Sequence, residues 1–181
     1  MPTYNAPTRD TRFVINEMLE LESFGNLPGF EMATPDMVEA VVNEAGKFCS
    51  EVLAPINQIG DQQGCTRHED GSVTTPDGFK EAFEQYREAG WGTISAPEEF
   101  GGQPQSTLTL TVLRETFAAC NSPLTRYIFG PGPGVLHIAE GELRENYLEP
   151  VLKGEKRGAF GFTEPDSAKR PSWGVIDGDH V

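Results

Sequence analysis

The chain has 181 residues, and its 28 acidic and 14 basic side chains give a formal net charge of −14 at pH 7. Because proteins bind nucleic acids and anionic membranes mainly through lysine and arginine, this balance argues against both as partners. No apolar run approaches the roughly 20 residues that span a bilayer, and the N-terminus lacks the basic start and apolar core of a secretory signal.

Two helical signals occupy the N-terminal region. An amphipathic stretch runs from about Arg9 to Phe24. Its expected apolar face consists of Phe13, Val14, Met18 and Leu21. A stronger signal runs from Thr34 to about Ile59, where apolar residues recur every three or four positions. Thr34 is the expected N-cap, and Pro55 is expected to kink the helix or end it near Ala54.

Two more helices are predicted in the middle of the chain. The first has Thr75 as its expected N-cap, carries apolar residues from Phe79 onward and stops at Gly90. The second runs from about Ser106 to Ala119, and its threonines lower its helix propensity, so burial is needed to hold it. Shorter helical segments are expected at 134–139 and 142–148.

Loops are expected between these helices: an exposed one at 61–77, a compact apolar one at 90–102 and a Gly/Pro-rich one at 123–134. After Lys153 the pattern changes, and residues 157–163 and 175–181 predict strands, the second entering an Asp-Gly hairpin turn. The chain is therefore expected to be a helical domain followed by the unfinished start of a β domain.

The cysteines and histidines do not form a known metal or redox motif. Cys49, Cys65 and Cys120 contain no CxxC pair, and the three histidines are far apart, so no metal site is expected. Cys49 falls on an apolar helical face and is expected to be a small core residue. Free thiols suit a reducing compartment, which favours a cytoplasmic location.

Three groups of residues could form a catalytic or binding site. Glu98 and Glu99 could form an acid–base pair, or they could solvate a tight turn closed by two glycines. Residues 129–134 could present backbone amides to an anion, or they could form a stiff connector, since they lack the ending of a phosphate loop. Residues 160–166 place a hydroxyl between aromatic rings and could hold a flat heteroaromatic ligand, or they could form an ordinary strand-to-turn corner.

Three segments together resemble the acyl-CoA dehydrogenases. Residues 90–102 resemble a loop of that family, 148–155 resemble the helix end and turn before its middle domain, and 161–166 (Gly-Phe-Thr-Glu-Pro-Asp) resemble its flavin-contacting segment. They occur in the family's order, and the resemblance covers essentially the whole chain. Residues 4–10 and 27–30 further resemble the N-terminal extension of longer members, among them the branch that acts on methylthiopropanoyl-CoA.

The resemblance implies a mainly α fold in three parts. Residues 1–33 would be an N-terminal extension, 34–156 the helical acyl-CoA dehydrogenase N-terminal domain, and 157–181 the truncated start of a middle β-barrel domain. The family's C-terminal four-helix bundle, which supplies the catalytic glutamate, would lie outside this chain. No catalytic residue is therefore assigned among the 181.

The resemblance also implies FAD as the cofactor. Thr163 and the backbone around Phe162 would face the pyrimidine edge of the flavin, and Phe160 would lie beside its ring system. The family reaction is the α,β-dehydrogenation of an acyl-CoA in fatty acid metabolism, in which a carboxylate removes the α-proton and the β-hydrogen passes to the flavin as hydride. Expected partners are an acyl-CoA, an electron-transfer protein or quinone-linked acceptor, and a second copy or another chain that supplies the missing domains.

One departure from the family pattern leaves two hypotheses open. Lys169 and Arg170 replace the hydroxyl and acidic positions that usually follow Thr-Glu-Pro, either altering a substrate contact or forming a solvated turn. The chain could be a fragment or subunit of a flavin-dependent acyl-CoA dehydrogenase that is inactive alone, which an unpaired strand edge favours. It could instead be a non-catalytic helical interaction module or a degenerate remnant of the family, which the replaced positions favour.

Overall fold

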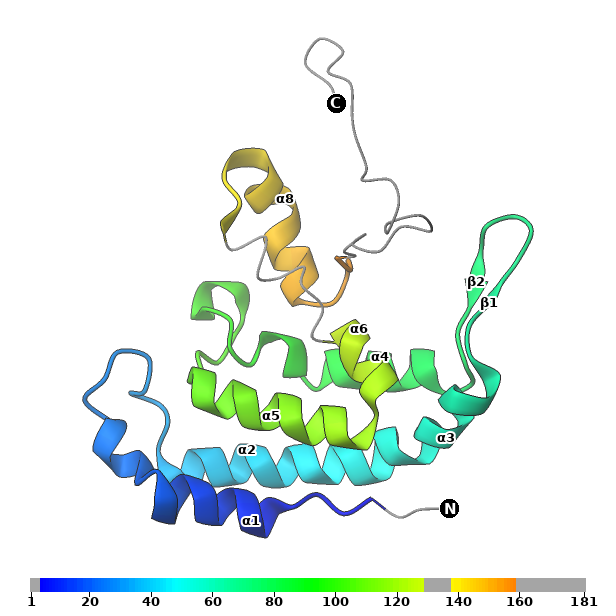
Figure 1. The fold of residues 1–181 in the computed structure, drawn as a ribbon. Coiled ribbons are helices and arrows are strands. Elements are labelled where there is room, and N and C mark those ends of the chain that lie inside the picture. Colours follow the sequence, from blue (N-terminus) through cyan, green and yellow to red (C-terminus); the bar gives the residue numbers. More distant parts are fainter. Residues whose placement is uncertain (1–3, 129–137, 159–181) are drawn as a thin grey trace, which may run out of the picture.

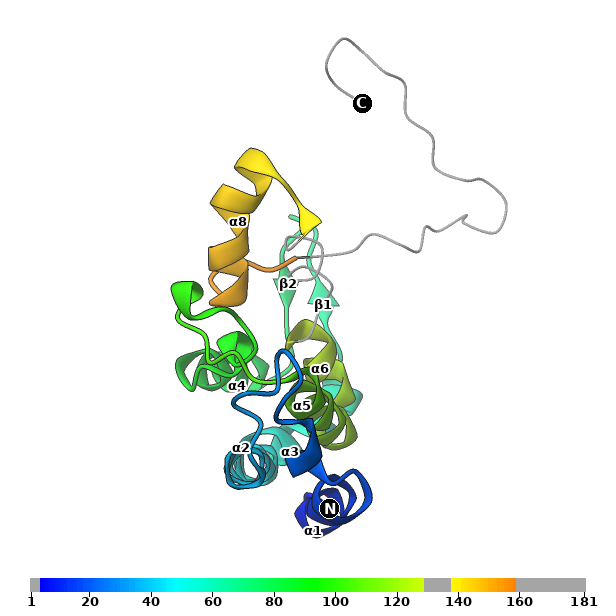
Figure 2. The ribbon, with the colours of Figure 1, turned by 90° about the vertical axis from the view of Figure 1, so that its left-hand side faces the viewer.

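The computed structural model describes residues 4–128 and 138–158, which are mainly helical, as the sequence predicts. The elements in chain order are α1 (Thr8–Phe13), η1 (Val14–Met18, π-helical), η2 (Leu21–Phe24, 3₁₀), α2 (Pro35–Phe48), η3 (Cys49–Leu53, π-helical), α3 (Ala54–Gln63), β1 (Thr66–Arg67), β2 (Val73–Thr74), α4 (Phe79–Glu88), η4 (Trp91–Thr93, 3₁₀), η5 (Glu98–Phe100, 3₁₀), α5 (Thr107–Cys120), α6 (Ser122–Ile128) and α8 (Gly141–Leu152). Figures 1 and 2 show α1 along the outer side of α2, α5 on the inner side, and α8 beyond α4.

The longest helical path runs from Pro35 to Gln63 through α2, η3 and α3. Thr34 caps it as predicted, because its hydroxyl accepts a hydrogen bond from the Met37 amide at 3.3 Å. Pro55 has no amide hydrogen to donate to the carbonyl four residues earlier, and the π-helical turn η3 ends two residues before it, at Leu53. The interruption is therefore where the proline predicts it, but the helical path continues past Ile59.

Two expected boundaries are wrong. Helix α4 begins at Phe79 with Gly78, in the left-handed region at φ +81°, as its N-cap, and Thr75 lies outside the helix. Residues 61–77 are not a plain loop, because they include the end of α3 and the antiparallel hairpin β1–β2, in which Thr66 pairs with Thr74. In the hairpin turn the Asp70 carboxylate accepts from the Ser72 hydroxyl at 2.6 Å and from the Ser72 amide at 2.9 Å, and these two hydrogen bonds hold the pKa of Asp70 below its usual range.

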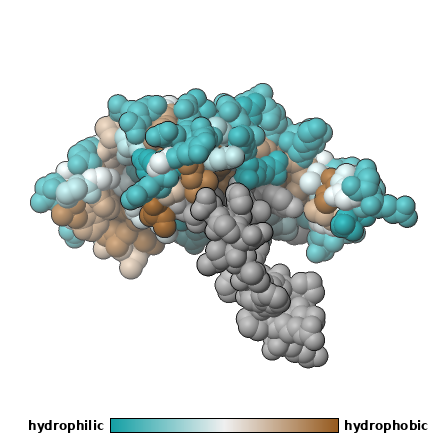
Figure 3. Space-filling view, turned by 90° about the horizontal axis from the view of Figure 1, so that it is seen from above, coloured by the Kyte–Doolittle hydropathy of each residue, from teal (hydrophilic) through white to brown (hydrophobic). Residues whose placement is uncertain are grey.

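The predicted apolar face near the N-terminus is also largely wrong. Phe13 is 57% exposed and Met18 66% exposed, and Val14 is exposed too, so of the four predicted residues only Leu21 is buried. The π-helical turn η1 changes the residue spacing around the axis, so a period of 3.6 residues assigns the wrong face. Figure 3 shows apolar surface gathered at the end of the molecule that carries the segment after η1, the left end in Figures 1 and 3.

The C-terminal half holds further helices. Helix α5 forms where it is predicted, with the Ser106 hydroxyl accepting from the Thr109 amide at 3.2 Å. Residues 123–128, expected to be part of a loop, lie in α6, and α8 extends the predicted 142–148 segment to Leu152. The expected strands at 157–163 and 175–181 lie almost wholly outside the described residues, as does the expected helical segment at 134–139, of which only residues 138 and 139 are described.

The main core lies between α2, η3, α4 and α5. Cys49 is buried there, as expected, and Phe117 of α5 is the aromatic centre of the cluster. Within the two described ranges, no helix has the length and apolar character that a bilayer crossing requires.

Candidate functional site

A cavity of about 250 Å³ opens between α4, the loop 90–101, the end of α8 and the segment 153–158. Its apolar wall consists of Phe83, Tyr86, Phe100, Ile128, Val151 and Leu152. Its cationic side chains are Arg87, Lys153, Lys156 and Arg157. The combination of flat apolar surface and positive charge suits a ligand with an aromatic or acyl part and an anionic group.

Helix α4 supplies the inner wall through its apolar face. Phe83 and Tyr86 stand three residues apart on this face, and their rings are stacked with centroids 6.2 Å apart. Burial raises the pKa of Tyr86, so its hydroxyl stays protonated and neutral at physiological pH. On the opposite side, Leu148 and Leu152 of α8 are buried against Ala96 and hold the helix end over the loop.

Gly92 allows the loop to lie close to the end of α8. A Cβ atom at this position would lie 2.9 Å from the carbonyl oxygen of Leu152 and 3.6 Å from the Tyr86 ring. Contacts as short as 2.9 Å between a side chain and a backbone atom require the structure to shift. Gly92 therefore fixes how closely two walls of the cavity approach each other.

We expect Gly92→Ala to destabilise the chain by about 1–3 kcal/mol, because the added methyl group displaces the end of α8. Urea unfolding followed by circular dichroism measures this change. The matched control is Gly25→Ala, where an added Cβ would have an ordinary contact of 3.6 Å and φ is −58°. Equal stability of the two variants would contradict the proposed close contact.

The four cations beside the cavity are held in two ways. Arg87 pairs with Glu84, and Lys153 pairs with Glu149 at 2.6 Å. Hydrogen bonding to these carboxylates raises the pKa of Arg87 and of Lys153 above their usual values, so both stay charged.

Aromatic faces hold the other two cations. The Lys156 ammonium lies 4.6 Å from the centroid of the Tyr147 ring. The Arg157 guanidinium lies 4.0 Å from the centroid of the Phe83 ring. The cavity lining thus carries four cationic side chains and one carboxylate, that of Glu155, in a chain whose net charge is −14.

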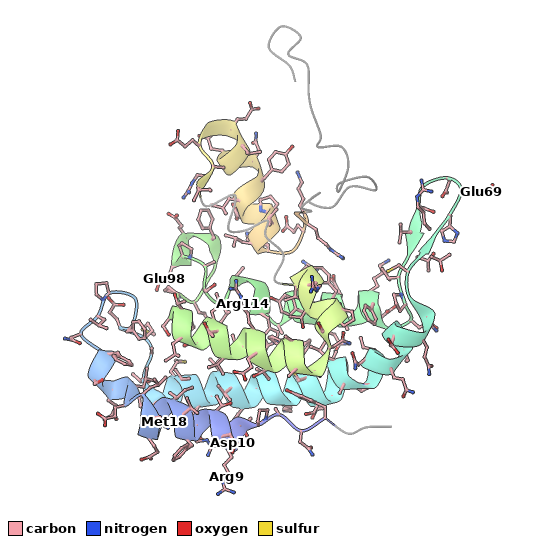
Figure 4. The ribbon with its side chains drawn as sticks, viewed as in Figure 1. Arg9, Asp10, Met18, Glu69, Glu98 and Arg114 are labelled. Carbon is pink, nitrogen blue, oxygen red and sulfur yellow. The ribbon has the colours of Figure 1, made fainter. Side chains whose placement is uncertain are left out.

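The carboxylate pair singled out in the sequence does not reach this cavity. Glu98 and Glu99 lie on η5, and both are exposed. Figure 4 labels Glu98 on this turn. The turn is closed by Gly101 at φ +74° and by Gly102, where a Cβ would lie 2.1 Å from the Ala96 carbonyl oxygen. The structure thus favours the solvated turn over the acid–base pair.

The other candidates lie outside the described residues. These are Phe160, Phe162 and Thr163, the basic pair at 169–170, and the segment 129–134. The last described residue, Gly158, lines the cavity. Among the described residues, no group of three or more His, Cys, Asp or Glu side chains could hold a metal ion.

Sequence reasoning missed the cationic cavity itself. Lys153, Lys156 and Arg157 fall within five residues of one another, which is a high local density for an acidic chain and was the available signal. Arg87 could not be added to them from the sequence, because its proximity depends on how α8 packs against the loop.

Comparison with known proteins gives the family. Residues 35–155 match the model of the acyl-CoA dehydrogenase N-terminal domain, and the chain belongs to the acyl-CoA dehydrogenase family. It is 29% identical over 168 residues to the 3-methylmercaptopropionyl-CoA dehydrogenase of Ruegeria pomeroyi, which covers 91% of this chain and 28% of that protein. It is 27% identical over 162 residues to the butyryl-CoA dehydrogenase of Syntrophomonas wolfei, and the matched region covers 87% of this chain and 27% of that protein.

A shorter match is to a subunit of a larger complex. The CarC subunit of the caffeyl-CoA reductase–Etf complex of Acetobacterium woodii is 29% identical over 91 residues, which is 48% of this chain and 24% of that subunit. The chain therefore spans less than a third of the length of each of these relatives.

Proposed function

We propose that this chain supplies one wall of the flavin and acyl-CoA site in a flavin-dependent acyl-CoA dehydrogenase. The observation that carries the proposal is the cavity. Segments that belong to the matched family domain enclose it. Gly158 lies at its rim, and the Phe-Gly-Phe-Thr-Glu-Pro segment follows in the sequence at 160–165. The reaction would be the α,β-dehydrogenation of an acyl-CoA. The chain would consist of the extension 1–33, the helical domain 34–156 and the start of the β domain at 157–181.

The described residues fit part of such a ligand. A volume of about 250 Å³ is slightly below the roughly 300–1,000 Å³ of small-molecule sites, so these walls alone would hold only a portion of FAD or acyl-CoA. Phe83 and Phe100 offer aromatic surface, and the cations at 153–157 suit phosphate groups, which both molecules carry.

Each proposed residue has a separate task. The Thr163 hydroxyl and the backbone around Phe162 would hold the pyrimidine edge of the flavin, and Phe160 would cover its ring. Bound FAD would supply the hydride acceptor, while the protein aligns the substrate and excludes water. No glutamate of these 181 residues is given the role of base. The proposed electron acceptor is an electron-transfer protein or a quinone-linked partner, and the proposed location is the cytoplasm.

A chimera tests the proposal. Residues 1–165 of this chain would replace the equivalent part of the Ruegeria protein, and we expect the purified chimera to retain FAD and an acyl-CoA to bleach its visible flavin absorption. Thr163→Val in the chimera should slow bleaching by at least about tenfold, because a group that stabilises charge on the reduced flavin is lost. Thr107→Val, on the exposed side of α5, is the control and should have no effect.

Two results would contradict the proposal. One is a folded chimera, by gel filtration and circular dichroism, that loses its flavin or is not bleached. The other is an unchanged bleaching rate in Thr163→Val. If the large graft does not fold, a graft of residues 154–165 alone tests the same contacts. The isolated 181-residue chain should show no dehydrogenation of any acyl-CoA.

A further inference from the structure

A pair of cysteine thiols lies in the core, and neither lines the cavity. Cys49 begins η3 and is fully buried, while Cys120 ends α5 and is 5% exposed. The Cys120 thiol donates a hydrogen bond to the Cys49 carbonyl oxygen at 3.2 Å, and the Cys49 thiol donates to the Thr116 carbonyl oxygen at 3.7 Å. The two side chains therefore lie against each other where η3 packs on α5.

The packing of the helices keeps this pair together. Helix α5 lies against both α2 and η3, so both sulfur atoms sit on rigid elements. A disulfide bond requires the two Cβ atoms to lie about 3.5–4.5 Å apart, and the Cys120 sulfur already lies 3.2 Å from the carbonyl oxygen of Cys49 itself. Little movement is therefore needed to join them.

We propose that Cys49 and Cys120 form a site of reversible oxidation, at which hydrogen peroxide converts the two thiols to an intramolecular disulfide bond. In the first step the Cys120 sulfur, having lost its proton, attacks one peroxide oxygen and the O–O bond breaks. This yields the Cys120 sulfenic acid, and the departing hydroxide takes up the thiol proton to become water. In the second step the Cys49 sulfur attacks the sulfenic sulfur, the S–O bond breaks, and hydroxide leaves with the Cys49 proton as a second water.

In the two steps together, the two thiols give two electrons to one molecule of hydrogen peroxide. Cys120 is the residue that reacts first. Its side chain is 5% exposed, whereas that of Cys49 is fully buried. Once Cys120 has lost its proton, the Cys49 thiol beside it turns from the Thr116 carbonyl oxygen to the thiolate sulfur, and this lowers the pKa of Cys120. The neighbouring Cys120 side chain, together with burial, raises the pKa of Cys49, which stays protonated until the second step.

Tyr4 and the residues after it cover the pair. The Tyr4 hydroxyl donates at 3.0 Å to the Thr116 carbonyl oxygen, which also accepts from Cys49, and the ring packs on the core. Burial raises the pKa of Tyr4 to about 12, so Tyr4 is a neutral cover and not a base. The segment passes closely over Gly46, where a Cβ would lie 2.9 Å from the Ala6 Cβ. Peroxide enters when this segment opens locally.

The test uses the full chain with Cys65→Ser, which removes the exposed cysteine and leaves the buried pair. The folded protein is treated with hydrogen peroxide, alkylated after denaturation and measured by intact-mass and peptide mass spectrometry. We expect the loss of two hydrogens, a linked pair of peptides that contain Cys49 and Cys120, and full reversal by dithiothreitol. Cys49→Ala and Cys120→Ala should each abolish the linked product.

Tyr4→Ala should speed disulfide formation by about tenfold, while Tyr4→Phe, which keeps the ring, should change it much less. In the wild-type chain, oxidation of exposed Cys65 shows that the peroxide dose is sufficient. The proposal is wrong if both buried thiols stay reduced at that dose, or if they gain oxygen without becoming linked. If the Cys65→Ser variant does not fold, peptide mapping of the wild-type chain shows whether Cys49 and Cys120 become linked.

Discussion

Replacing Phe117 with alanine is expected to lower the free energy of unfolding by about 3–5 kcal/mol. The side chain is fully buried in α5. Its ring makes edge-to-face contacts with Phe48, Tyr86 and Trp91, at centroid distances of 5.9, 6.1 and 5.6 Å. Alanine would leave a cavity among three aromatic rings that come from different elements. Urea unfolding followed by tryptophan fluorescence measures the loss, because Trp91 lies against the missing ring.

Phe13→Ala is the matched control. The same atoms are removed from a side chain that is 57% exposed, so the change should be within about 0.5 kcal/mol. A similar loss in the two variants would show that Phe117 is not the centre of the core.

Asn121→Leu is expected to destabilise the chain by about 2–4 kcal/mol. Asn121 is fully buried between α5 and α6, and its side-chain amide donates to the Leu53 carbonyl oxygen at 3.1 Å. Its side-chain oxygen accepts from the Leu124 amide at 3.1 Å and so caps α6. Leucine has similar volume but would remove both hydrogen bonds and leave two buried backbone groups without these partners.

The control for this variant is Ser122→Ala at the neighbouring exposed position, which should have almost no effect. Thermal unfolding by circular dichroism compares the two variants. An Asn121→Leu protein that unfolds at the wild-type temperature would contradict the role of Asn121 as a buried link between η3 and α6.

The sequence predicted those parts of the fold that local chemistry marks. Thr34 and Ser106 cap helices where they were expected to, and Pro55 marks an interruption of the long helix. The hairpin and α6 were missed because their stability rests on particular hydrogen bonds, which the side-chain oxygens of Asp70 and Asn121 accept from backbone amides, in segments whose composition suggests loops. No residue in the sequence marks the π-helical turn at η1, and the apolar face was therefore assigned wrongly there.

The family could be recognised from short motifs at 90–102, 148–155 and 161–166, and the match over 35–155 confirms the resemblance. The cavity could not be predicted in the same way. Its walls at 83–101 and 151–158 are separated by about 50 residues of sequence, and their meeting depends on the close contact at Gly92. The assignments to Phe160, Phe162 and Thr163 stay predictions.

The π-helical turn at Cys49–Leu53 has a consequence for insertions and deletions in this family. Such a turn holds about one residue more than an α-helical turn in the same length of helix. Removing one residue there would restore α-helical geometry and leave the helix faces on both sides in register. Removing one residue within α2 would instead rotate one part of the helix by about 100° relative to the other and expose its buried face. Single-residue length differences among relatives should therefore be tolerated at this turn and not in α2.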